Sequence, residues 1–130
     1  MIHPIEYSPT GAMVSFSGQV FADEILEANK ALLSHPEFPN HKFAIWNYLS
    51  AGSLSYDKAQ IRSIAEQDRR DSWKNPNRKV AVVANSPILF GLARMYEAYY
   101  GGGPWEIKVF YDLEQAEQWV GIKGKPGCSA

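Results

Sequence analysis

The hydrophobic positions of the chain form short runs that alternate with stretches of helical spacing. Ile5–Tyr7 and Ala12–Phe16 are short apolar or alternating runs. Pro9 and Gly11 lie in the connection between them and favour a turn. This pattern predicts two strands joined by a tight connection, with Gly18 ending the second strand.

Helical spacing follows from Asp23, which we expect to cap a helix through about Ser34. Every third or fourth residue is apolar, and the predicted inner stripe is Ile25, Ala28 and Leu32. Pro36 ends this helix, because proline disfavours helical geometry in the residue before it. Phe43–Trp46 is a short apolar run that predicts a buried strand.

The next helix has the clearest start signal in the sequence. Asp57 and Gln60 have the spacing of a capping box, and Tyr56 and Ile61 can pack across the same turn as a hydrophobic staple. The predicted inner stripe is Ile61, Ile64 and Ala65. The side chains predicted to face water are Arg62, Glu66, Asp68, Arg69 and Arg70. We expect the helix to stop before Asn75.

Val80–Ala84 is apolar on both faces, which is typical of a central parallel strand. Ser86 then stands as a helix cap, with Pro87 at the first helical position. The helix that they start is predicted to run to about Tyr100.

A further strand is predicted at Glu106–Phe110, followed by a last helix that Asp112 caps and Gly121 ends. The order is therefore β-β-α-β-α-β-α-β-α. Strands that alternate with helices imply right-handed crossovers, so we predict a single-domain α/β fold with a mixed, mostly parallel sheet and flanking helices. The domain covers residues 1–121, and the Gly- and Pro-rich residues 122–130 form a flexible tail.

Composition narrows the class of protein. The 130 residues include 13 basic and 14 acidic side chains, and this near-neutral balance argues against nucleic-acid binding. The single cysteine, Cys128, lies in the predicted tail, so neither an internal disulfide nor a cysteine metal site is expected. We find no secretion signal and no apolar stretch near the roughly 18 residues of a membrane span. The sequence therefore predicts a cytoplasmic protein without stable membrane insertion.

Two late segments carry a resemblance to a known family. Val82–Glu97 and Val109–Val120 resemble the core of the SpoIIAA-like proteins, a branch of the STAS superfamily, and Phe16–Gly18 and Ile61–Arg70 fit the same pattern. The resemblance extends over nearly the whole predicted domain. It implies a mixed sheet flanked by helices, which is the arrangement predicted from the residues.

The resemblance also implies two functions. The superfamily includes anti-sigma-factor antagonists, which are switched by phosphorylation of a serine at a helix start that corresponds here to Ser55–Lys58. The usual Asp-Ser-Ser/Thr-Gly pattern is absent from this chain, and Asn47 stands where these families often carry an aspartate. The group is also similar in fold to CRAL-TRIO lipid-carrying domains, which implies an apolar ligand as the alternative.

The carboxyl ends of the strands are where open α/β sheets tend to bind ligands. Two groups of residues are expected there: a serine-rich loop at Ser50–Asp57 and the helix start at Asn85–Phe90. The candidate residues for ligand or partner binding are Ser53, Ser55, Tyr56, Asp57, Asn85, Ser86, Phe90 and Gly91. The alternative is that Ser86 is simply a helix cap and the serine-rich stretch simply a connection.

The helix that starts at Pro87 is apolar nearly all round, as in deeply buried helices or interfaces. Gly91 in its middle costs about 1 kcal/mol relative to alanine, which predicts close packing at that position. Such a helix would serve a homodimer contact or a pocket for an apolar ligand. The alternative is a wide core face whose tyrosines Tyr96, Tyr99 and Tyr100 keep their hydroxyls in water.

No catalytic or metal-binding pattern is found. Ser86 lacks the glycines of a nucleophile elbow, since Ala84 and Ile88 replace them. His3, His35 and His41 lack the spacing of metal ligands. We therefore predict a non-enzymatic regulatory or protein-interaction module without cofactor or metal. The alternative is a carrier or sensor of a lipid or other apolar small molecule.

Overall fold

A computed structural model describes residues 1–55 and 57–121. One sheet holds five strands in chain order: β1 (Glu6–Ser8), β2 (Gly11–Phe21), β3 (Phe43–Ser55), β4 (Lys79–Val83) and β5 (Glu106–Phe110). β1 runs antiparallel to β2, and the other neighbours are parallel. The predicted α/β fold with a mixed, mostly parallel sheet is confirmed.

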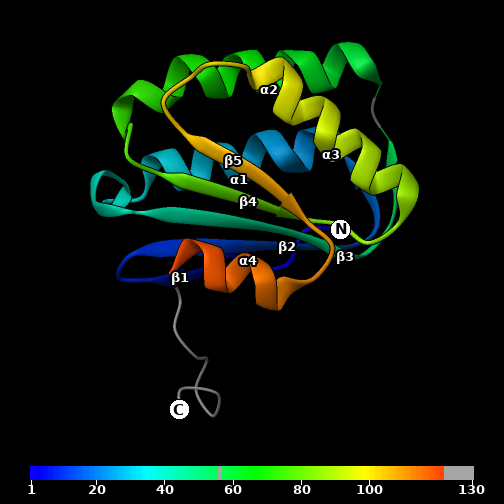
Figure 1. Ribbon diagram of the computed structural model, residues 1–130, viewed down its shortest axis with the longest axis horizontal. Coiled ribbons are helices and arrows are strands. Elements are labelled where there is room, and N and C mark those ends of the chain that lie inside the picture. The colour runs from blue at the N-terminus through cyan, green and yellow to red at the C-terminus, as the bar shows by residue number, and fades with distance from the viewer. Residues whose placement is uncertain (56, 122–130) are drawn as a thin grey trace.

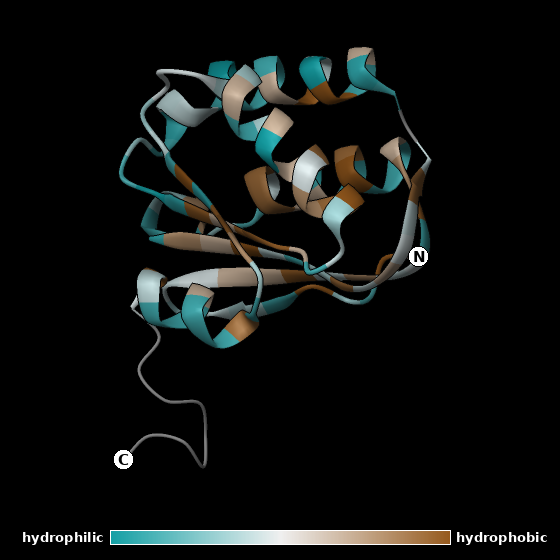
Figure 2. Cartoon of the chain, turned by 45° about the vertical axis from the view of Figure 1, so that its right-hand side comes forward, coloured by the Kyte–Doolittle hydropathy of each residue, from teal (hydrophilic) through white to brown (hydrophobic). Residues whose placement is uncertain are grey.

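Three helices cover one face of the sheet and the fourth covers the other (Figures 1 and 2). The first three are α1 (Ala22–Ser34), α2 (Lys58–Asp71) and α3 (Pro87–Tyr100), and the fourth is α4 (Leu113–Val120). Because β2 to β5 are added in one direction, right-handed crossovers place all three connecting helices on the same face. Short 3-10 turns, η1 (Phe38–Asn40) and η2 (Ser72–Lys74), follow α1 and α2.

The core is divided by the sheet into two parts. The larger cluster lies under α1, α2 and α3 and includes Val14, Trp46, Val80 and Leu89. The smaller cluster lies under α4 and is built around Ile45, Ala81, Val83, Phe110 and Ala116. β4 contributes to both clusters, which explains why Val80–Ala84 is apolar on both faces.

β2 and β3 are longer than the sequence predicted. Gly18 does not end β2; it takes a φ of +62° at an irregularity in the strand, a conformation that favours glycine. The predicted loop Ser50–Ser55 is the second half of β3 and pairs with β2 as far as Phe21 and Ser55. The prediction failed because backbone pairing between the two strands supplies the hydrogen bonds that these polar side chains do not signal.

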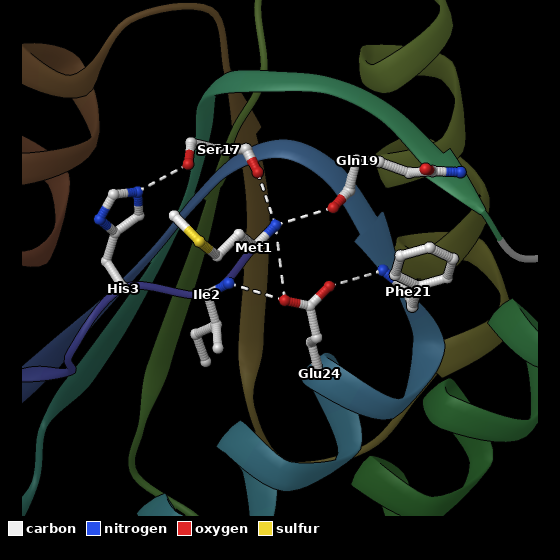
Figure 3. Close-up of polar contacts among 7 residues, drawn as sticks. All are labelled: Met1, Ile2, His3, Ser17, Gln19, Phe21 and Glu24. Carbon is white, nitrogen blue, oxygen red and sulfur yellow. Dashed lines mark hydrogen bonds and ion pairs between the residues drawn. The ribbon is translucent and has the colours of Figure 1, made fainter.

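The start of the chain is tied to the second half of β2 and to α1 (Figure 3). The amino group of Met1 donates hydrogen bonds to the carbonyl oxygens of Ser17 at 2.5 Å and Gln19 at 2.7 Å. Glu24 accepts from the backbone N–H of Ile2 at 2.7 Å and of Phe21 at 2.9 Å. These bonds hold the part of β2 that extends past Gly18.

The caps of the helices follow the sequence signals with one exception. Asp57 accepts from the N–H of Gln60 at 2.8 Å and Asp112 from that of Gln115 at 2.8 Å. Gly121 ends α4 with a φ of +93°. Asp23, the predicted cap of α1, lies inside the first turn of the helix instead. The carboxylate of Glu24 accepts a hydrogen bond from the backbone N–H of Phe21, the residue before the helix. The staple predicted for Tyr56 lies outside the described residues.

Candidate functional site

The first predicted group of site residues lies at the far end of β3. Ser53 and Ser55 belong to the strand itself, and Asp57 caps α2. Leu54 between them lines a pocket on the three-helix face. Because side chains alternate along a strand, Ser53 and Ser55 point to the opposite face, where the Gln19 amide contacts the Ser55 hydroxyl. Tyr56 lies outside the described residues.

The second predicted group lies where β4 passes into α3. Asn85 is exposed, and the hydroxyl of Ser86 accepts from the N–H of Leu89 at 3.1 Å, as a helix cap does. The ring of Phe90 stacks on Tyr111 with 4.1 Å between centroids and 3° between planes. Tyr111 is 57% exposed, and Ile88, two residues before Phe90 in the first turn of α3, is 75% exposed. Large apolar side chains therefore meet water at this edge.

Gly91 does not have the close packing that the sequence predicted. It is exposed, and an added Cβ would meet no heavy atom within 4 Å. The inference failed because a glycine in a helix is not by itself evidence for a neighbour.

A pocket of about 50 Å³ lies between the sheet and the three helices of its larger face. Most of its lining is apolar, and the lining side chains come from β3, β4, α1, α2 and α3. The residues are Ile25, Asn29, Trp46, Tyr48, Leu54, Ile61, Ile64, Asp68, Val80, Val82, Leu89, Leu92, Ala93 and Tyr96. The half-buried members are Asn29, Leu54, Leu92 and Tyr96, which mark its solvent side.

The pocket lies between the two predicted groups of site residues. Leu54 is flanked by Ser53 and Ser55, and Leu89 directly precedes Phe90. Ser53 and Ser55 point to the face of the sheet opposite the pocket, so of these neighbours only Leu54 and Leu89 line it. The sequence did not predict the polar residues within the pocket.

Those polar residues centre on Asp68, which is 6% exposed. Tyr96 donates its hydroxyl hydrogen to Oδ2 of Asp68 at 2.5 Å, and the Asn29 amide donates to Oδ1 at 3.1 Å. The three side chains come from α3, α1 and α2. One carboxylate thus connects all three helices beside an otherwise apolar pocket.

Burial controls the protonation of this carboxylate. Loss of solvent raises the pKa of Asp68 to about 7, while the Tyr96 hydrogen bond and the charge of Arg78 oppose the rise. The same burial, with the nearby Asp68 charge, raises the pKa of Tyr96. A titratable group with such a shifted pKa in a pocket is a recognised mark of a functional site.

The sequence prediction for Asp68 is wrong, since this side chain was expected to face water. The helical period could have revealed its position. Asp68 follows Ile61 by seven residues and Ile64 by four, which places it on the buried stripe of α2. Its charge was taken as evidence of exposure, because aspartate is rarely buried without partners.

Arg78 is a second buried charge near this site and is 4% exposed. Its guanidinium lies 5.0 Å from the ring of Phe38 and 4.7 Å from that of Trp105. Its Nε and Nη2 make no hydrogen bond to the described residues. Burial lowers the pKa of Arg78 to about 10.

The described part of the chain also bears on metal sites, histidine contacts and membrane-spanning helices. No group of three or more His, Cys, Asp or Glu side chains is arranged to hold a metal ion there. His41 is buried among aromatic rings, and its imidazole makes no hydrogen bond within residues 1–55 and 57–121. No described helix combines the length and hydropathy that a membrane crossing requires.

Comparison with known proteins places the fold. No family model matches the chain, and no curated protein is found as a relative. Seven chains of solved structures match, among them two whose similarity covers more than 90% of this chain. One is an uncharacterized protein of the DUF3478 family with a SpoIIAA-like fold, from Shewanella loihica PV-4. Its identity is 16%, its TM-score is 0.57, and 92% of each chain is covered.

The other similar structure is the anti-sigma factor antagonist SpoIIAA in its unphosphorylated form. Its identity is 12% and its TM-score is 0.58, with 94% of this chain and 100% of that chain covered. The chain therefore has a SpoIIAA-like fold, as the sequence resemblance implied. At such identities the likeness concerns the fold.

Proposed function

We propose that this chain is a SpoIIAA-like regulatory module that acts by binding a protein partner and has no catalytic activity of its own. The partner would meet the carboxyl-end surface, which we define as Ser53, Ser55, Asp57, Asn85, Ile88, Phe90 and Tyr111. These residues lie at the carboxyl ends of β3, β4 and β5 or directly after them.

The observation that carries this proposal is the exposure of large apolar side chains at that edge. Ile88 is 75% exposed in the first turn of α3, and Tyr111 is 57% exposed where its ring stacks on Phe90. Aromatic and aliphatic side chains with polar residues around them are typical of protein interaction sites. The similarity in fold to an anti-sigma factor antagonist supports the same class of function.

A photo-crosslinking experiment tests the surface. A photoreactive amino acid replaces Ile88 in one variant and Trp73 in a control, because Trp73 is 68% exposed but lies on η2, away from that edge. We expect a discrete crosslinked partner from position 88 in the producing cells and none from position 73. Ile88→Asp should abolish co-purification of that partner. Identical products from both positions would contradict the proposal.

Two finer versions of the proposal have their own measurements. In a phospho-switch, intact-mass analysis of protein from its native cells should show a phosphate on Ser53 or Ser55; unmodified protein in both active and inactive cells would eliminate it.

In a homodimer, the same surface would bind a second copy. Sedimentation should then show a dimer that Ile88→Asp dissociates and Trp73→Asp leaves intact.

A second function is favoured by the pocket. We propose as the alternative that the chain carries or senses a small, largely apolar molecule, since the pocket has apolar walls and a few polar groups, as ligand sites do. Native mass spectrometry of freshly purified protein should then show a stoichiometric adduct that denaturation releases. A clean mass would favour the protein-interaction function.

A further inference from the structure

We propose that the pocket under α1, α2 and α3 binds a small amphiphilic amine, whose cationic head meets Asp68 and whose apolar body lies against Leu54 and Leu92. This inference rests on the second function proposed above and specifies the ligand class for that site.

The carboxylate at the polar end of the pocket has unused hydrogen-bond acceptor sites. Both hydrogen bonds at Asp68 run toward the carboxylate, from the Tyr96 hydroxyl and from the Asn29 amide. A carboxylate offers about four acceptor sites, so about two are left open. A ligand that fits this end must donate hydrogen bonds, as an ammonium group does.

Charge favours the same ligand. Asp68 makes no ion pair within 4.0 Å among the described residues. The cation whose charge acts on it, Arg78, has its guanidinium between the rings of Phe38 and Trp105. A buried carboxylate without a direct counter-ion is costly, and a ligand ammonium would supply one.

The size of the pocket limits the head group. Its volume of about 50 Å³ has room for a few groups the size of a water molecule, since each needs roughly 10–15 Å³ of such space. An ammonium and its first carbons fit that space. Trp46 and Tyr48 contribute aromatic walls, which suit a cation. Half-buried Leu54 and Leu92 can then cover an alkyl body at the solvent side.

A purely structural role is the competing account, in which Asp68 simply connects the three helices. The two accounts differ in what a matched pair of probes should do. Hexylamine and hexanol have the same alkyl body, but hexylamine alone carries a cationic head. We would titrate each into isotope-labelled protein at about pH 8 and follow backbone amide shifts by NMR.

We expect hexylamine to shift amides of pocket residues and to bind at least about tenfold more tightly than hexanol, as a charge-assisted bond predicts. Asp68→Asn should remove that preference and leave hexanol binding unchanged. Glu66→Gln is the matched control, because Glu66 lies on the same helix outside the pocket and pairs with Arg62. It should bind both probes as the parent protein does.

Each contrary result overturns a defined part of the proposal. Equal binding of hexanol and hexylamine in the pocket would refute the amine inference and leave the apolar carrier standing. No pocket shifts with either probe would refute both. Asp68→Asn binding hexylamine as well as the parent would also refute the role of the carboxylate. If that variant does not fold, the comparison of the two probes on the parent protein still decides.

Discussion

The hydroxyl oxygen of Tyr96 on α3 lies 2.5 Å from the carboxylate of Asp68 on α2, inside the larger core of the protein. Asn29 on α1 bonds the other carboxylate oxygen at 3.1 Å. The three helices on one face of the sheet are therefore joined through a single acid whose pKa burial raises to about 7. This arrangement has measurable consequences for stability.

The stability of the fold should depend on pH through Asp68. The pKa of this carboxyl is 3.8 without the fold and about 7 within it, so the folded state binds the proton more tightly. The contribution of Asp68 to the free energy of unfolding is therefore fully present below about pH 4 and is lost as the pH rises to about 7. The loss is up to roughly 4 kcal/mol, at 1.36 kcal/mol per pKa unit. Urea unfolding across this range should show the decline in the parent protein and a flatter profile in Asp68→Asn. An unchanged slope in that variant would assign the dependence to other groups; Glu66→Gln serves as the control, because Glu66 is an exposed acid on the same helix.

Tyr96→Phe should destabilise the fold more at high pH than at low pH. The hydroxyl donates to an ionised carboxylate at about pH 8, where such a bond contributes about 2 kcal/mol, and to a neutral carboxyl at about pH 5, where about 1 kcal/mol is expected. Urea unfolding at both pH values measures the difference. Tyr99→Phe is the control, because Tyr99 makes no such bond to Asp68. Equal losses at both pH values would argue that Asp68 does not titrate between them.

Gly91→Ala should stabilise the protein by about 0.5–1 kcal/mol. Gly91 lies in the interior of α3 and its added methyl group would meet open space, so the change reduces only the freedom of the unfolded chain. Thermal and urea unfolding are the measurements. Gly101→Ala should do the opposite, because Gly101 ends the same helix with a φ of +66°. A loss of stability in Gly91→Ala would mean that something does pack there.

Glu24→Ala should loosen the start of the chain and cost about 1 kcal/mol, as the loss of a helix cap does. Glu24 accepts hydrogen bonds from the backbone N–H groups of Phe21 and Ile2. These bonds lower the pKa of Glu24, and the bond from Phe21 has the largest effect. Glu24 therefore stabilises the fold at pH values above its ordinary pKa, and this stabilisation is lost on acidification.

Hydrogen exchange at Ile2 and Phe21 measures that change directly. Both amides should exchange faster in Glu24→Ala near neutral pH. Glu27→Ala on the same helix is the control, since Glu27 is exposed. Unaltered exchange in Glu24→Ala would mean that the strand pairing of β2 alone holds these residues.

None of the described side chains that the sequence singled out for ligand or partner binding lines the pocket, which extends from Trp46 and Val80, in the first halves of β3 and β4, to Leu54 and Leu89. Asp68 could have been predicted, because the helical period places it on the stripe of Ile61 and Ile64. The pairing of Asp68 with Tyr96 and Asn29 could not, because these residues are 28 and 39 positions away.

The sequence by itself determined the order of the elements and the starts of α2, α3 and α4, because caps such as Asp57 and Ser86 act on N–H groups within three residues. Only the tertiary structure decided that Ser50–Ser55 is strand, since its hydrogen bonds depend on β2. It also decided that a charge at Asp68 is buried. Local patterns report the covalent neighbourhood of a residue, whereas pairing and burial depend on segments that the fold brings together.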